Sequence, residues 1–297
     1  MIVRGEHRSC LLVARHHPLT LFACCRLDLD RYQPWEHSSR PVSIRRGHVA
    51  EDGFRGLHRH GSALKQRIQI QFVDQFGNVE AGIDGGGLFK EFLTSLVREA
   101  FDTNRGLWKA TADQAIYPNP HSYAQQAEQL EWYTFLGRVL GKAIYEGILV
   151  DIKFASFFLS KWLGKQSYLD DLASLDSLDP ELAKGLNFVL RAYTGDFEDL
   201  ALNFTVTDEE FGVSTTTELV PGGAQIPVTR ENRLEYVYRV SHYRLSDQIE
   251  KQSAAFFSGL VSADCASSSR QRCSHLLILR LLQCPSRAKW SIRAGCG

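Results

Sequence analysis

The stretch Phe135–Gly147 reads FLGRVLGKAIYEG, and its apolar residues recur with the period of an α-helix. Two glycines, Gly137 and Gly141, fall inside this run, and each costs a helix interior about 1 kcal/mol relative to alanine. Such a cost indicates that another element packs close to the helix backbone there. The spacing therefore predicts one long helix whose apolar face carries Leu136, Val139, Leu140, Ala143, Ile144 and Gly147.

Upstream of this helix, the period of the apolar residues changes from two to about four. Ile68, Ile70 and Phe72 alternate with glutamines, which predicts a half-exposed strand. After a turn-like segment, FGNVEAGIDGGG, helical spacing resumes in LFKEFLTSLVREAF. The apolar face of that second helix is predicted to carry Leu88, Phe92, Leu96 and Ala100.

Downstream, FASFFLSKWLG predicts a further apolar helix, and Asp179-Pro180 is a start signal for another. Aspartate caps the first turn of a helix, and proline is well suited to the first helical position. From there Leu182, Leu186, Val189, Leu190 and Tyr193 form one stripe. Periodicity alone leaves two interpretations open: the stripe packs into the core, or it lines an apolar groove for a partner.

The remainder of the body is predicted to be short strands followed by a last helix. LNFTV is typical of a short strand, and ELVPGGAQIPVT is typical of a hairpin that turns at its two glycines. Thr229 is positioned to cap a final helix that runs to Leu260. The expected fold class is α+β, predominantly helical with small β-hairpins.

Charge and cysteine content divide the chain into three segments. Residues 1–40 have six Lys/Arg against four Asp/Glu, residues 41–260 have 22 against 29, and residues 261–297 have six against one. All seven cysteines lie outside the middle segment. We expect an atypical or disordered leader, a folded body from a reducing compartment (cytoplasm or nucleus), and an unrelated basic tail rich in Ser, Arg and Cys. The net charge of zero does not favour nucleic-acid binding, and no apolar run is long enough for a membrane span.

Two candidate ligand sites fail on their spacing. The glycines of GIDGGG are followed by Leu-Phe rather than by Lys and Ser/Thr, and the third glycine of a dinucleotide motif is replaced by Lys90. Structural turns are the better interpretation of these glycines. The cysteines of the tail include no close pair of the kind that structural zinc sites use. No cofactor and no metal are expected.

Taken together, the ordered blocks of residues 42–260 resemble the HECT-type ubiquitin-protein ligases. The blocks include VSIRRGHVAEDGF, IQIQFVDQFGNVEAGIDGGGLFKEF, YPNPHS and FLGRVLGKAIYEGILVDIKFASFFLSKWLG. The body is most similar to the branch that includes ubiquitin-protein ligase type C and its plant relatives. The resemblance implies a bilobal transferase in which a helical N-terminal lobe docks a ubiquitin-conjugating enzyme. A smaller C-terminal lobe carries the cysteine that accepts ubiquitin.

The resemblance covers an incomplete N-terminal lobe, residues 41–260, and the C-terminal lobe is expected to be absent. It implies a ligase of the ubiquitin-transferase family that lacks its thioester-forming cysteine, so no catalytic residue is assigned. Expected partners are a conjugating enzyme, the ubiquitin that this enzyme carries as a thioester, and an unknown protein substrate. The alternative is an inactive binding module or decoy for conjugating enzymes. Alignment with the family places the partner-binding positions at Leu182, Leu186, Tyr193, Leu200, Leu202, Tyr236 and Val240.

Overall fold

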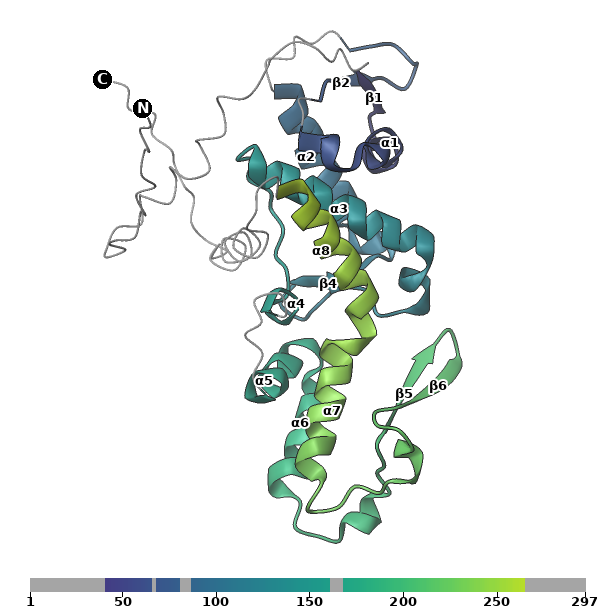
Figure 1. The fold of residues 1–297 in the computed structure, drawn as a ribbon, viewed down its shortest axis with the longest axis vertical. Helices are drawn as coiled ribbons and strands as arrows, with labels where there is room; N and C mark the ends of the chain where they lie inside the picture. Colours follow the sequence, from purple (N-terminus) through teal and green to yellow (C-terminus); the bar gives the residue numbers. More distant parts are fainter. Residues whose placement is uncertain (1–40, 66–67, 81–86, 161–167, 265–297) are drawn as a thin grey trace, which may run out of the picture. The chain divides into compact units, whose positions relative to one another are not determined.

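The computed structural model describes residues 41–65, 68–80, 87–160 and 168–264. Helices dominate these ranges, with three pairs of short strands between them (Figure 1). The predicted α+β, predominantly helical class is therefore confirmed. The helices are α1 Val49–Leu57, α2 Gly87–Ala100, α3 Ala127–Tyr145, α4 Ser156–Ser160, α5 Tyr168–Leu178, α6 Pro180–Asn187, α7 Arg233–Leu245 and α8 Glu250–Asp264. The strands are β1 Val42–Arg45, β2 Ile70–Val73, β3 Trp108–Ala110, β4 Ile116–Pro118, β5 Thr205–Glu210 and β6 Val213–Glu218.

Helix α3 is the long helix that the sequence predicts, and α8 packs along it (Figure 1). A Cβ atom added to Gly137 would lie 2.8 Å from the backbone nitrogen of Leu260, which confirms the predicted close neighbour. A Cβ atom added to Gly259 of α8 would likewise overlap the backbone carbonyl of Thr134 on α3. The two glycines thus let the helix backbones approach where they cross.

Gly147, which the spacing places on the face of α3, ends the helix instead. Its φ of +69° lies in the left-handed region that glycine occupies without strain. The N–H groups of Gly147 and Ile148 donate to the carbonyls of Ile144 and Ala143, at 3.1 and 2.8 Å. This is the hydrogen-bond pattern of a Schellman C-cap, and the carbonyls at the helix end are satisfied by it.

The first part of the body confirms two predicted elements and adds a strand that the sequence analysis missed. Ile70 and Phe72 are buried on β2, and Phe92 and Leu96 are buried on α2. Strand β1 pairs with β2 in parallel, with Val42 opposite Ile70. This pair is not a hairpin, because α1 lies between the two strands and parallel strands need such a crossover. The glycines at 82 and 85–86 lie outside the described residues, so their predicted turn role stays a prediction.

Two predictions for the second half of the body are wrong. The Gly222-Gly223 segment makes a turn before α7, whereas the hairpin is β5–β6 and turns at Phe211-Gly212. The last helix is divided in two by Ser246, whose φ and ψ of −123° and −66° are not helical. The predicted capping role of Thr229 is found in part: helix α7 begins after Asn232, but the Thr229 hydroxyl accepts the Asn232 N–H at 3.4 Å and the Thr229 N–H donates to the Asn232 side chain at 2.7 Å.

Candidate functional site: the apolar surface after α6

Helix α6 begins where the sequence predicts. Asp179 is its N-cap, and its carboxylate accepts a hydrogen bond from the backbone N–H of Leu182 at 3.0 Å. Pro180 occupies the first helical position, where no N–H donor is needed. This cap fixes the direction in which the stripe of apolar residues leaves the first turn.

The stripe does not continue as a regular helix. After Asn187 the backbone widens into a π-helical turn over Phe188–Ala192, which closes when the N–H of Tyr193 donates to the carbonyl of Phe188 at 2.9 Å. A π-turn holds one more residue than an α-turn, so the side chains after it are rotated relative to an ideal helix. Phe188, the first residue of the turn, is 51% exposed, and its ring centroid lies 5.7 Å from that of Tyr193, the residue that closes the turn.

The segment after the π-turn is held by short-range hydrogen bonds. The hydroxyl of Tyr193 donates to the carbonyl of Asp196 at 2.7 Å. The Asp196 carboxylate in turn accepts the N–H of Glu198 at 3.1 Å and caps a short 3-10 turn, Phe197–Leu200. The guanidinium of Arg230 donates to the carbonyl of Thr194 at 3.3 Å. The segment Tyr193–Leu200 is therefore held in place by hydrogen bonds between side chains and backbone groups.

The seven positions aligned with the family's partner site fall into two groups. Leu186, Tyr236 and Val240 are buried, with exposed fractions of 4%, 8% and 3%. The ring of Tyr236 packs edge-on against Phe204 at a centroid distance of 5.6 Å, and burial raises the pKa of its phenol. The other four are partly exposed and pack against the edge of the core: Leu182, Tyr193, Leu200 and Leu202.

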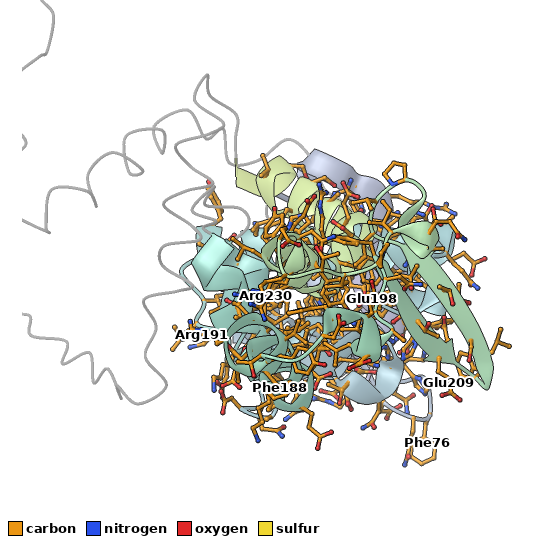
Figure 2. The ribbon with its side chains drawn as sticks, turned by 90° about the horizontal axis from the view of Figure 1, so that it is seen from below. Phe76, Phe188, Arg191, Glu198, Glu209 and Arg230 are labelled. Atoms are coloured by element: carbon orange, nitrogen blue, oxygen red, sulfur yellow. The ribbon has the colours of Figure 1, made fainter. Side chains whose placement is uncertain are left out.

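Phe188 is the prominent exposed residue that sequence reasoning missed. It lies next to the predicted stripe rather than on it, so a regular helix would place it among polar positions. The only signal was an aromatic residue off the apolar face, which is weak because isolated exposed apolar residues are common. The exposed Arg191 lies in the same turn as Phe188, and the exposed Arg230 donates to the carbonyl of Thr194 next to Tyr193; Figure 2 labels all three of Phe188, Arg191 and Arg230. An apolar centre with charged neighbours is suited to protein contact.

The described residues offer no arrangement for covalent chemistry on a thiol, because every cysteine of the sequence falls in residues 1–40 or 265–297. Within the described ranges, His, Asp and Glu side chains do not gather into a group of three that could bind a metal ion. In the same ranges, no helix has the length and apolar character that a membrane crossing requires.

Comparison with known proteins identifies the family. A model of the HECT-domain (ubiquitin-transferase) family matches residues 94–291. The match starts inside α2 and ends in the segment predicted to be an unrelated tail, so the predicted boundary near residue 260 stays a prediction.

Individual relatives carry ligase names. A probable E3 ubiquitin protein ligase of Schizosaccharomyces pombe is 52% identical over 228 residues, which cover 76% of this chain and 22% of the relative. The E3 ubiquitin-protein ligase UPL6 of Arabidopsis thaliana is 46% identical, with 73% and 21% covered. The ubiquitin-protein ligase E3B of Homo sapiens is 42% identical, with 74% and 21% covered. The chain spans about a fifth of the length of these relatives. On the family match over most of its length, the chain belongs to the HECT-domain family of ubiquitin transferases.

Proposed function

We propose that this part of the chain docks a ubiquitin-conjugating enzyme on behalf of a HECT-type ubiquitin ligase, and that the docking site is the surface around Phe188. The observation that carries the proposal is a half-exposed phenylalanine at the start of a π-helical turn, with the partly exposed Tyr193 ring 5.7 Å from it. π-turns are frequent at functional sites, because they place side chains where a regular helix would not.

The docking site has an exposed layer and a supporting layer. In addition to Phe188, the exposed layer consists of residues whose side chains are partly exposed: Leu182, Tyr193, Leu200 and Leu202. Leu186, Tyr236 and Val240 support the site from below, because almost none of their surface reaches solvent. Aromatic anchors that become fully desolvated on binding carry most of the affinity in protein interfaces. Phe188 has the size and the exposure for that role.

The direct experiment is a binding titration with purified conjugating enzymes and the Phe188→Ala chain. Removal of a central aromatic anchor is expected to cost about 1–2 kcal/mol, a roughly tenfold or greater loss of affinity. The matched control is Phe76→Ala, because Phe76 is also exposed, at 78%, and lies in the turn after β2 (Figure 2). Unchanged affinity in Phe188→Ala, or an equal loss in both variants, would refute the assignment.

For the ligase as a whole, the proposed activity rests on membership of the HECT-domain family. We propose that the conjugating enzyme arrives with ubiquitin as a thioester and that the ubiquitin is transferred to a protein substrate. The cysteine-free body suits a reducing compartment, and we propose the cytoplasm or the nucleus. The proposed ligase role is supported by the names of the relatives, because fungal, plant and animal proteins among them are all named ubiquitin ligases.

A further inference from the structure

The break at Ser246 separates two parts of the folded body. On one side is the docking segment, defined as residues 168–245, which contains α5, α6, the π-turn and α7. On the other side are α8 and the helices and strands of residues 41–160, defined here as the main body. Helix α7 is joined to α8 by the non-helical Ser246 and a short 3-10 turn, Asp247–Ile249, and rotation within such a connection changes the relative direction of two helices. Contacts across the break therefore decide how the docking segment is held.

The β5–β6 hairpin supplies such contacts. Asp208 on β5 accepts hydrogen bonds from Tyr243 Oη at 2.8 Å and from the guanidinium of Arg244, both near the end of α7. The same carboxylate accepts a hydrogen bond at 2.9 Å from Gln248 Nε2, two residues beyond Ser246. One side chain thus binds both sides of the break.

Glu210, two residues along the same strand, reaches the main body. Its carboxylate accepts the backbone N–H of Ser122 at 3.0 and 3.2 Å and the hydroxyl of Ser122 at 3.0 Å. His121 Nδ1 lies 3.4 Å from the same carboxylate. Ser122 and Glu210 are 88 residues apart, so this contact is tertiary. Hydrogen bonds to an ionised carboxylate are among the stronger ones that proteins make.

We propose that Glu210 is a positioning residue that fixes the orientation of the docking segment relative to the main body. Strand β5 of the hairpin connects the two parts: Asp208 contacts α7, and Glu210 contacts the 121–122 turn. The orientation in which a docked conjugating enzyme is presented then depends on the Glu210 contact. That consequence rests on the proposed docking function, whereas the positioning itself does not.

The test measures the distance between the two parts directly. In the full chain with its seven cysteines replaced by serine, spin labels are attached at Lys184→Cys on α6 and Glu128→Cys on α3. Both positions are exposed. Pulsed electron paramagnetic resonance then gives the distance distribution in the free chain. Loss of several charge-assisted hydrogen bonds is expected to raise the ratio of displaced to native orientation about tenfold or more in Glu210→Ala.

Two further variants make the test specific. Glu209→Ala removes the same charge from the neighbouring, exposed residue (Figure 2) and is expected to leave the distribution unchanged. Ser122→Pro removes both donors and leaves Glu210 intact. Proline is tolerated there, because Ser122 opens a 3-10 turn and the preceding His121 is extended. Ser122→Pro is expected to broaden the distance distribution in the same way as Glu210→Ala. It therefore tests the same contact if the Glu210→Ala protein does not fold.

An unchanged, narrow distribution in a folded Glu210→Ala or Ser122→Pro chain would overturn the positioning role. An equal change in Glu209→Ala would overturn it as well, because net charge would then be the cause. Conjugating-enzyme affinity is measured separately with Phe188→Ala, so a failure of the docking proposal leaves the distance result intact. Conversely, failure of the positioning role leaves the docking result intact.

Discussion

The crossing of α3 and α8 makes a sharp prediction for Gly137→Ala. The new Cβ would overlap the carbonyl of Phe256, with its centre only 2.9 Å from the carbonyl carbon and 2.8 Å from the nitrogen of Leu260. Carbon atoms pack best at about 3.5–4.0 Å, so the helices must separate by about 1 Å. Both obstacles are backbone atoms of a helix, and rotation of a side chain cannot relieve them.

The cost follows from what the separation undoes. Four side chains of the two helices have at most 1% of their surface exposed: Leu136, Leu140, Phe256 and Phe257. A gap of 0.5–1 Å forfeits about a quarter to a half of each dispersion contact, and overpacking of this kind typically costs about 1–3 kcal/mol. Alanine recovers about 1 kcal/mol as the better helix former. With the rigid backbone placing the cost near the upper end, we expect a net destabilisation of about 2 kcal/mol.

The assay is chemical or thermal unfolding followed by circular dichroism. A net loss of about 2 kcal/mol corresponds to a decrease in Tm of roughly 4–8 °C for a domain of this size. The matched control is Gly185→Ala, the same substitution in α6 with no atom within 4 Å of the added Cβ. That variant is expected to gain up to about 1 kcal/mol. A Gly137→Ala chain that is as stable as the wild type would refute the close crossing of α3 and α8.

Three other predictions test the core, the charges and the chemistry. Leu186→Ala should lower the free energy of unfolding by about 2–5 kcal/mol, measured by denaturant titration, because Leu186 is 4% exposed. Asp52→Asn should cost about 1.5–3 kcal/mol at pH 7, since the Asp52 carboxylate accepts hydrogen bonds from Arg45 Nε and Nη2 at 2.9 and 2.8 Å. These bonds lower the pKa of Asp52. The stabilisation that the ionised carboxylate contributes is therefore present above about pH 4 and disappears as the pH falls through the depressed pKa. The free energies of unfolding of the wild type and of Asp52→Asn, measured from pH 7 to about pH 3, should converge as the pH falls. Incubation with a charged conjugating enzyme should yield no reducible ubiquitin adduct on this chain, and an adduct on a non-reducing gel would assign the acceptor role to one of its cysteines.

Burial also changes how the docking site should be tested. Sequence and family alignment together suggest Tyr236→Ala as a variant that weakens docking while the fold survives. Tyr236 is 8% exposed and packs on Phe204, so its truncation is expected to cost about 3 kcal/mol or more of stability. Weaker binding would then have two explanations. Phe188→Ala avoids the ambiguity, because little of the packing depends on an exposed ring.

The elements that the sequence predicted well are those whose signals are local. The face of α3 repeats over several turns, and Asp179-Pro180 combines a cap with a helix-compatible proline, so both elements begin or run as predicted. Gly137 was informative for a different reason. Glycine in a buried helical face lowers helix stability, and a close crossing is a common compensation. The partner in that crossing, α8, lies more than a hundred residues away and could not be identified by spacing alone.

The elements that were missed depend on distant partners or on unusual backbone. Strands β1, β3 and β4 are three or four residues long, too short for an alternating pattern to stand out. The true hairpin turns at Phe211-Gly212, where Phe211 has a φ of +52°. Tight hairpin turns favour Asn, Asp or Gly at such a position, so the two glycines at 222–223 gave the stronger signal. Both glycines instead serve a turn in which Gly223 packs against the backbone of Phe204.

The proposed docking site illustrates why a stripe of apolar residues cannot by itself reveal a binding surface. Regular periodicity identifies residues that share one face, and that face is usually the buried one, as it is for Leu186 and Val189. An accessible apolar surface also needs apolar residues that lie outside that buried face. Here Phe188 lies outside the stripe and is exposed, and the π-turn that follows brings the Tyr193 ring to a centroid distance of 5.7 Å from it. The turn is defined by one backbone hydrogen bond, Tyr193 N–H to Phe188 O, which no residue type in the sequence announces. The residues that build the core could therefore be predicted from the sequence, whereas the residue that we propose as the docking anchor could be identified only from the structure.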